Sequence, residues 1–218
     1  MNQHRAHPDI YQLHIVLRGI SPLIWRRLLV RSDTTLTQLH RMLQLLFDWS
    51  NFYLHHFHMY GKDYGSNAAD TRHVTLHAFG FQRGERFRYV YNYFAQWQCD
   101  IRLEAVLPYD PTRFYPVCTG GKRPAPPEDC DSPWAYLEEL DAHRYPSLAA
   151  LRVLADAAQV VLDAPAHVSI REVIGDLEAI REAMDRLEVY EQLQPGAFQR
   201  RHVNAQLRQQ QWTGDKAS

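Results

Sequence analysis

The sequence predicts an α+β protein in which an antiparallel, β-grasp-like sheet with one helix packed on it is followed by a helical C-terminal part. Three observations support this class. Two strand-like segments with alternating apolar residues open the chain, one segment with helical periodicity follows, and several more strand-like segments come next. From about residue 147 onward the pattern is helical. With 218 residues and 45% hydrophobic content, the chain can bury a full core.

The first two strands are expected to form a β-hairpin. Apolar and polar side chains alternate along residues 10–17, "IYQLHIVL", so that one face of the strand is apolar. The turn "GISP" at 19–22 contains a glycine and a proline, which favour a change of direction. A second extended segment, "LIWRRLLV", follows at 23–30. Two neighbouring strands joined by such a short turn indicate a hairpin.

A helix is predicted to begin near Thr35 and to end near Asp48. Apolar residues recur there every three or four positions and form one buried stripe, at Leu36, Leu39, Leu43 and Leu46. Thr35 and Gln38 match a capping box, in which the two side chains satisfy free backbone N–H groups at the start of the helix. This is the helix expected to lie across the sheet.

Four further segments are expected to be strands, because they are rich in aromatic and β-branched residues. They cover residues 53–60, 74–81, 86–94 and 97–107. Residues 108–133 contain many prolines, glycines and aspartates with little periodicity, which predicts a long ordered or semi-ordered loop. Long loops of this kind are often functional.

The chain after this loop is expected to be helical. Ser132 is placed as an N-cap with Pro133 at the first helical position. A capping box at Ser169 and Glu172 starts a later helix with a long apolar stripe. This helix is expected to pair with the apolar segment at 148–162 as a hairpin within the chain, and pairing with a second subunit is the alternative.

Two domains follow from this pattern. Residues 1–146 are expected to form the α+β core with its Pro-rich loop at 108–133, and residues 147–218 a helical extension packed on that core. The extension ends in a basic, glutamine-rich helix at 197–212. A homo-oligomer formed through these C-terminal helices is one possible assembly.

Charge and cysteine content constrain the class of protein. The net charge is −1, but residues 1–60 carry six basic against three acidic groups and residues 196–218 carry four against one. Either region could meet an acidic partner, and a solvated surface without such a role is the alternative. Apolar runs are short and the N-terminus has no apolar signal core, so we expect a soluble, cytoplasmic protein without membrane contact. Cys99, Cys118 and Cys130 form no Cys-x-x-Cys pair and are expected to be reduced.

Five strings occur together in the sequence: "YQLHIVLRGISPLIWRRLLV", "TTLTQLHRMLQLLFDW", "LHHF", "YPVCTGGKRPAPPEDC" and "PGAFQRRHVNAQL". In combination they resemble the plasmid pRiA4b ORF-3-like family, whose members are also labelled TnpR-type passenger proteins of insertion elements. The resemblance extends from Ile10 to Leu207. It implies an α+β fold and an association with mobile elements of bacteria and archaea, but no assigned activity.

The chain departs from the family pattern in two places. Asn92, Tyr93, Phe94 and Ala95 stand where the family usually reads Asp-Phe-Gly-Asp, and Asp131-Ser132 replaces a glycine pair. Both changes remove glycines or acidic groups, so chemistry that depends on those groups is not implied here.

Trp25, Arg26 and Arg27 are the leading candidates for a binding surface. On a strand the two arginines point to opposite faces, so only one can join a given patch. We expect one of them to pair with Glu128 or Asp129 and so to pin the Pro-rich loop. The alternative is a phosphate- or partner-binding role for the arginines. The two carboxylates could also form an acid/base or metal site, although no further acids lie at a diagnostic spacing.

The basic C-terminal helix adds Arg200 and Arg201 as candidate binding residues.

Histidines and cysteines supply weaker metal candidates, and no cofactor is expected. His56 and His58 share one face of a strand and could hold a divalent ion. A DNA-nicking enzyme would also need a third ligand and a nucleophile, for which Tyr89, Tyr91 and Tyr93 are available. Cys118 and Cys130 could hold zinc together with a histidine, but their spacing is not diagnostic.

A serine-recombinase activity, which the TnpR label suggests, has little support in the sequence. Ser21 near Arg26 and Arg27 is the only trace of a nucleophilic serine among arginines, and Ser21 precedes a proline that shapes the turn. We therefore expect a non-catalytic binding or accessory module of a mobile element, with a protein or a nucleic acid as its partner. The alternative is a metal-dependent enzyme that acts on nucleic acid.

Overall fold

The computed structural model describes residues 7–67, 70–142, 147–165, 176–193 and 198–212. The chain folds into two compact units. The sheet unit comprises Met1–Tyr136 and Gly196–Ser218, and the helical unit comprises Leu137–Pro195. The boundary at residues 146 and 147 between a core and an extension stays a prediction.

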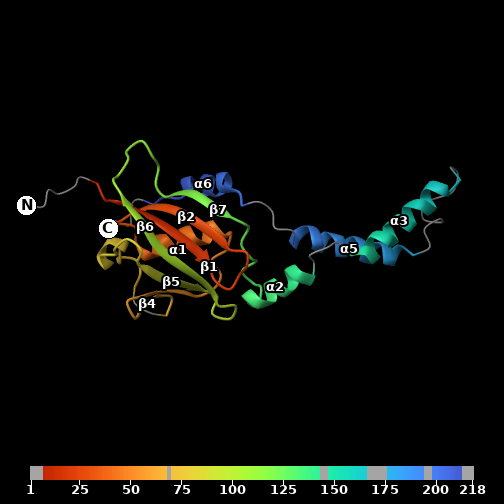
Figure 1. Cartoon of the computed structure of the whole chain (residues 1–218), viewed down its shortest axis with the longest axis horizontal. Coiled ribbons are helices and arrows are strands. Elements are labelled where there is room, and N and C mark those ends of the chain that lie inside the picture. Colours follow the sequence, from red (N-terminus) through yellow and green to blue (C-terminus); the bar gives the residue numbers. More distant parts are fainter. Residues whose placement is uncertain (1–6, 68–69, 143–146, 166–175, 194–197, 213–218) are drawn as a thin grey trace, which may run out of the picture. The chain divides into compact units, whose positions relative to one another are not determined.

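The sheet unit is built on one antiparallel sheet whose seven strands lie in the order β4-β3-β5-β6-β1-β2-β7 (Figure 1). The strands are β1 (Ile10–Leu17), β2 (Ile24–Arg31), β3 (His55–Met59), β4 (Lys62–Gly65), β5 (Arg86–Tyr91), β6 (Trp97–Leu107) and β7 (Val117–Lys122). This architecture, together with the helices described below, confirms the predicted α+β class.

The predicted hairpin is formed by β1 and β2, which pair from Ile10 opposite Arg31 to Leu17 opposite Ile24. Along β1 the side chains of Leu13, Ile15 and Leu17 are buried and those between them are half-buried. The alternation in the sequence therefore gives the sheet one face that lies in the core and one that does not.

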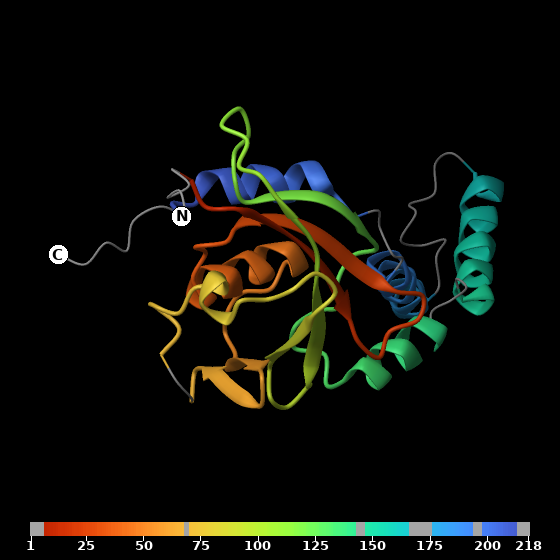
Figure 2. The same ribbon diagram turned by 60° about the vertical axis from the view of Figure 1, so that its left-hand side comes forward.

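Helix α1 (Leu36–Phe47) lies against the core face of the curved sheet (Figure 2). Its ends match the prediction. Thr35 Oγ1 accepts a hydrogen bond from the N–H of Gln38, and Gln38 Oε1 accepts one from the N–H of Thr35, which completes the capping box. Asp48 ends the helix in the left-handed conformation. The four predicted leucines are all buried.

The strand predicted at 74–81 is wrong. Residues Leu76–Phe79 form a single 3₁₀ turn, η1, which ends at Gly80 with a φ of 61°. The backbone of this segment bonds to residues 32–34 and makes one isolated bridge, between Thr35 and Thr75. Its aromatic residues pack on one another, with the rings of Phe79 and Phe81 stacked at 5.4 Å. The aromatic residues that suggested a strand here pack in a cluster next to a 3₁₀ turn instead.

The loop predicted at 108–133 contains strand β7, which the prediction missed. β7 pairs with β2 and forms one edge of the sheet. Its sequence "VCTGGK" has two glycines and no alternating pattern, so composition favours a loop. The glycines are explained by the neighbours on the two faces of β7. A Cβ on Gly120 would lie 3.2 Å from the Trp25 ring, and a Cβ on Gly121 would lie 2.4 Å from the Phe198 ring.

The remaining helices are α2 (Pro133–Ala142), α3 (Leu148–Asp163), α5 (Leu177–Leu193) and α6 (Arg200–Gln209). Ser132 Oγ accepts a hydrogen bond of 3.0 Å from the N–H of Ala135, as predicted for an N-cap. Helices α3 and α5 contact each other, which confirms the pairing of these segments within the chain. The capping box predicted at Ser169 and Glu172 lies outside the described residues.

Helix α6 returns to the sheet unit and lies beside β7 (Figures 1 and 2). Asn204 pairs with the backbone of Cys118 as a neighbouring strand would. Its Oδ1 accepts from the N–H of Cys118 at 2.8 Å, and its Nδ2 donates to the carbonyl of Cys118 at 2.9 Å. Arg200 Nη1 donates to the carbonyl of Thr119 at 2.9 Å. The C-terminal helix thus satisfies polar groups at the free edge of the sheet.

Candidate binding surface

The face of the sheet opposite α1, which we call the outer face, carries mostly polar and charged side chains. They alternate with the buried residues of four adjacent strands and are half-buried or exposed. The set comprises Gln12, His14, Val16, Trp25, Arg27, Arg86, Arg88, Asp100, Arg102 and Glu104. Two of the predicted binding residues, Trp25 and Arg27, therefore lie on the same face.

Four basic side chains of the outer face stand in one row across the strands. Arg86 of β5 is directly opposite Arg102 of β6, Arg102 is opposite His14 of β1, and His14 is opposite Arg27 of β2. Neighbouring strands are about 4.8 Å apart, so the row extends over roughly 14 Å. We call these four residues the basic row.

One carboxylate balances part of the basic row. Glu104 accepts hydrogen bonds from Arg27 Nε at 2.7 Å and Nη2 at 3.2 Å, and from Arg102 Nη2 at 3.2 Å. The Arg27 guanidinium is the main reason that the pKa of Glu104 falls to about 2. Arg86 is exposed and has no acidic partner among the residues that the structure describes. Its guanidinium therefore adds to the positive charge opposite Arg102.

A second carboxylate, that of Asp100, lies near the arginines of the adjoining part of the surface. Asp100 lies 3.5 Å from Arg88 Nε and 3.6 Å from Arg18 Nε. Together, Arg18, Arg27, Arg86, Arg88 and Arg102 face two acidic groups, Asp100 and Glu104. The outer face is therefore positive although the whole chain carries a net charge of −1.

His14 lies in the middle of the basic row, and the positive charges around it affect its pKa. Burial is the main cause that lowers its pKa, and the charges of Arg27, Arg102 and Arg86 lower it further, against the opposing effect of Glu104. Burial and the neighbouring arginines therefore disfavour protonation of the imidazole, and an anion bound nearby would raise its pKa.

Trp25 places an aromatic ring next to the basic row. It is two residues from Arg27 on β2, and its ring lies 5.5 Å from the His14 ring and 5.4 Å from the Arg27 guanidinium carbon. The missing side chain at Gly120 lets the Trp25 ring lie close to β7. Lys122 is opposite Trp25 across the β2–β7 pair.

Arg26 points to the other face of β2 and is only 1% exposed. Its Nε donates to the carbonyl of Leu46, and its Nη1 donates to the carbonyls of Trp25 and Lys122, at 2.9 to 3.0 Å. The guanidinium carbon lies 3.9 Å from the centre of the Phe198 ring. Burial lowers the pKa of Arg26 to about 10. Arg26 thus holds α1, β7 and the start of α6 together inside the sheet unit.

The expected ion pair between these arginines and Glu128 or Asp129 is wrong. Glu128 instead accepts hydrogen bonds from the Tyr91 hydroxyl at 2.6 Å, the Ser50 N–H at 3.0 Å and the Ser50 hydroxyl. Its backbone carbonyl accepts from Asn92 Nδ2 at 2.9 Å and from Trp97 Nε1 at 3.3 Å. Glu128 therefore connects the Pro-rich loop to Ser50 and Tyr91 through uncharged donors and not through an arginine.

The other predicted binding residues do not lie on the outer face. Asp129 belongs to the turn after Glu128. Arg200 bonds to β7 as described above, and Arg201 follows it on α6 with an exposed side chain. Their roles in binding stay predictions.

The predicted metal residues His56 and His58 share one face of β3, as expected. His56 Nδ1 lies 3.1 Å from the Tyr93 hydroxyl, and His58 Nδ1 lies 2.7 Å from Asp63 Oδ1. Over the described part of the chain, no group of three or more His, Cys, Asp or Glu residues is arranged to hold a metal ion. Cys118 is buried and Cys130 half-buried, and neither forms a disulfide bond with a described residue.

Sequence reasoning missed a buried polar cluster beneath the core face. His40 and His55 stack with ring centres 3.5 Å apart and an interplanar angle of 5°. His40 Nδ1 lies 2.8 Å from the Tyr89 hydroxyl, which also accepts a hydrogen bond from Gln44 Nε2 at 2.8 Å. Burial lowers the pKa of His40 to about 4 and that of His55 to about 3. Both rings are therefore neutral at physiological pH. A polar pair at helical spacing, His40 and Gln44, was the only sequence signal.

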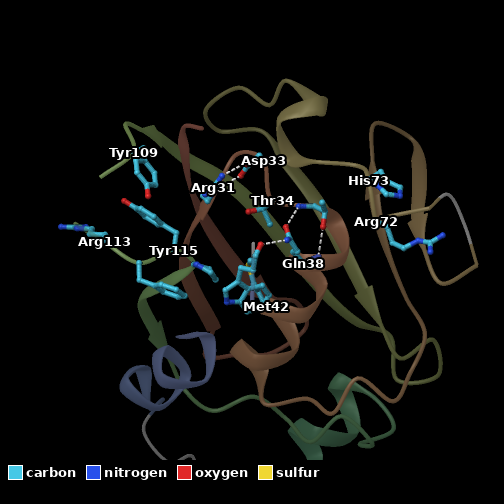
Figure 3. Close-up of a pocket in the computed structure, with 14 residues that line it drawn as sticks. Arg31, Asp33, Thr34, Gln38, Met42, Arg72, His73, Tyr109, Arg113 and Tyr115 are labelled. Atoms are coloured by element: carbon cyan, nitrogen blue, oxygen red, sulfur yellow. Dashed lines mark hydrogen bonds and ion pairs between the residues drawn. The ribbon is translucent and has the colours of Figure 1, made fainter. Parts of the chain in front are cut away.

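A cavity of about 660 Å³ lies next to the N-terminal part of α1 (Figure 3). Tyr109, Arg113 and Tyr115 line one side, and Arg72 and His73 line the other. The arginines there are balanced locally. Arg31 is bound by Asp33 at 2.9 and 2.6 Å, Arg72 lies 3.2 Å from Asp70, and Arg113 lies 3.2 Å from Asp110. This cavity therefore attracts anions less strongly than the outer face does.

These features define a class of protein: an α+β protein with an antiparallel sheet, one face of which is buried under a helix while the other presents a basic row beside an aromatic ring. The family model described as "Plasmid pRiA4b ORF-3-like protein" matches residues 9–160. The chain therefore belongs to the plasmid pRiA4b ORF-3-like family, as the resemblance predicted.

Two relatives have no assigned function. The chain is 29% identical over 142 residues to the uncharacterized protein y4hQ of Sinorhizobium fredii. The match covers 62% of this chain and 73% of the relative. The chain is also 32% identical to a protein of unknown function, MM3350 from Methanosarcina mazei Go1, whose crystal structure matches with a TM-score of 0.59 over 64% of this chain and 83% of that one. These relatives lend no support to the TnpR-type label. Among the described residues, no helix has the length and apolar character needed to cross a bilayer.

Proposed function

We propose that this protein is a non-catalytic binding module that captures a polyanionic partner on the outer face of its sheet, as an accessory of a mobile element. The single observation that carries the proposal is the basic row of Arg86, Arg102, His14 and Arg27, aligned across four strands with Glu104 as its main counter-charge. The plasmid origin of the family supports the association with mobile elements.

The arrangement of Arg86 and Arg102 favours ligand binding over a purely structural role. Like charges directly opposite each other on adjacent strands destabilise a sheet, by up to about 1 kcal/mol for a pair. Arg86 makes no compensating ion pair to a described residue. An anion that lies across β5 and β6 would relieve the repulsion, so ligand binding and fold stability are coupled at this position.

Charge reversal at Arg86 tests this coupling. Arg86→Glu places a carboxylate opposite Arg102, so we expect the free energy of unfolding to rise by about 0.2–1 kcal/mol. The same change removes a cation from the ligand surface, so we expect the affinity for fluorescein-labelled heparin to fall about tenfold in about 0.1 M salt. Urea unfolding and fluorescence anisotropy measure the two effects.

Arg41→Glu is the matched control, because it changes the net charge by the same amount. Arg41 is exposed on α1, and α1 lies against the face of the sheet opposite the outer face. The affinity of this control for heparin should stay within about twofold of the wild-type value. Equal losses in the two variants would assign the binding to net charge alone, and unchanged binding by Arg86→Glu would refute the proposed surface.

A further inference from the structure

The Trp25 ring has the environment of a stacking platform. One edge lies against the backbone of β7, where Gly120 leaves room, and the side chain remains half-buried. Cationic groups surround it: Arg27 at 5.4 Å, Lys122 opposite on β7, and the rest of the basic row beyond His14. An aromatic ring that the fold holds in place beside an arginine and a lysine is suited to a ligand with planar groups on a charged backbone.

Resting on the proposed function above, we infer that the polyanion is a single-stranded nucleic acid, which lies across the strands of the outer face with its phosphates on the basic row and one base stacked on Trp25. The row runs perpendicular to the strands, and Trp25 is offset from its Arg27 end by two residues along β2. Backbone and base of one strand could therefore engage the two features together.

Two other polyanions use this surface less completely. In a duplex the bases are stacked inside the helix and cannot reach the Trp25 ring unless they are flipped out. An acidic protein segment could pair with the arginines but has no planar base to stack on the ring. The combination of ring and cations favours a single strand over both.

The test compares probes of about twenty nucleotides: single-stranded oligo-dT, single-stranded oligo-rU, and a DNA duplex, each labelled with fluorescein, beside heparin and polyglutamate. The variants are Trp25→Leu and Trp25→Phe in the full-length protein. We expect the single strands to bind at least about tenfold more tightly than the duplex at equal salt. The two single-stranded probes distinguish DNA from RNA as the source of the strand.

Trp25→Leu should weaken single-strand binding by about 5- to 100-fold and leave heparin binding within about twofold, because only a base uses the ring. Trp25→Phe, which keeps an aromatic face, should restore most of the loss. As an independent readout, the Nε1 proton of Trp25 should shift in the NMR spectrum on addition of oligo-dT and not on addition of heparin. Circular dichroism on both variants checks that the fold is retained.

Each contrary outcome is informative. Equal losses of heparin and single-strand affinity in Trp25→Leu would show that Trp25 only positions the arginines, and this would overturn the stacking inference while polyanion capture stands. Duplex or polyglutamate binding as tight as single-strand binding would also overturn it and identify a duplex or an acidic protein as the partner. If none of the probes bind, the proposed function itself fails.

Discussion

At the scale of single residues, the stacked pair of His40 and His55 connects burial to pH dependence. Both rings lie on the core face of the sheet. His55 Nε2 has no hydrogen-bond partner among the described residues. Burial disfavours the charge that a proton on either ring would carry, and this lowers the pKa of both histidines. The site therefore favours the neutral form of both rings.

This predicts that the protein loses stability as the pH falls below about 6.5. In the unfolded chain both histidines have a pKa near 6.5, whereas in the folded chain the values are about 4 for His40 and about 3 for His55. Between these limits the unfolded state binds more protons, so lower pH favours unfolding by about 1.4 kcal/mol per pH unit for each histidine. Urea unfolding at a series of pH values between 7.5 and 4.5, roughly, measures the slope.

The variant His55→Phe keeps a ring that can stack on His40 and removes one titrating group. Its free energy of unfolding should depend on pH with a slope smaller by about 1.4 kcal/mol per pH unit. The exposed His77 provides the control, since His77→Gln should leave the slope unchanged. A slope in His55→Phe equal to that of the wild type would assign the acid sensitivity to other groups.

Arg26 and Arg27 show how far residue-level reasoning from the sequence extends. Their neighbouring positions on a strand correctly predict opposite faces. The partners could not be predicted in this way, because Glu104 lies on β6 and Leu46 on α1, and both approach only in the folded chain. The sequence suggested Glu128 or Asp129 as the partner, because such a pair would pin the Pro-rich loop, but the fold brings Glu104 to Arg27 instead.

At the scale of elements, β7 and α6 depend on each other. Asn204 and Arg200 of α6 satisfy backbone groups at the edge of β7, and Phe198 packs on Arg26 through the space that Gly121 leaves open. An edge strand with two glycines has little intrinsic preference for the strand conformation. Helix α6 therefore supplies much of what keeps β7 in the sheet.

A methyl group at either glycine tests this dependence. Gly121→Ala would place its Cβ 2.4 Å from the Phe198 ring, so the ring must move away from Arg26. We expect a loss of about 1–3 kcal/mol in the free energy of unfolding, as for other overpacked sites, with faster hydrogen exchange in α6. Urea unfolding and hydrogen-exchange mass spectrometry detect both effects.

Gly120→Ala is the matched control on the other face of the same strand. Its Cβ would approach the edge of the Trp25 ring at 3.2 Å, a contact that a small ring shift relieves. The loss should be below about 1 kcal/mol, and α6 should keep its protection. If Gly120→Ala costs as much as Gly121→Ala, the packing of Phe198 on Arg26 is not what secures α6.

At the scale of the whole molecule, the two units differ in how much apolar surface they bury. In the helical unit, Ala150 and Ala183 are the only fully buried residues among those whose side chains the structure describes. Several large apolar side chains remain exposed on α3 and α5: Leu148, Leu151, Val160, Leu162, Leu177 and Met184. The sheet unit, in contrast, contains nearly all the buried large side chains.

We therefore predict that the helical unit opens independently of the sheet unit. Amides of α3 and α5 should exchange with solvent at least about 100-fold faster than those of β1 and β6, because few buried contacts are lost on opening. Hydrogen-exchange mass spectrometry at low protein concentration makes the measurement. Equal protection of the two units would contradict this independence. Protection of α3 and α5 that increases with protein concentration would indicate a homo-oligomer formed through these helices.

The sequence by itself determined the elements whose signals are local. The β1–β2 hairpin, the limits and capping box of α1, the long strand β6 and the N-cap at Ser132 follow from periodicity and from side chains a few residues apart. Such interactions form within one turn or one strand, and their pattern is therefore written in neighbouring positions.

Only the tertiary structure decided how these elements meet. Sheet order brings Arg86, Arg102, His14 and Arg27 from four strands into one row, although they are up to 88 positions apart in the sequence. The same packing makes a strand of the glycine-rich β7 and buries Arg26 without a carboxylate. Periodicity predicts which face a side chain occupies, but strand order and register determine its neighbours, and these depend on contacts between distant segments.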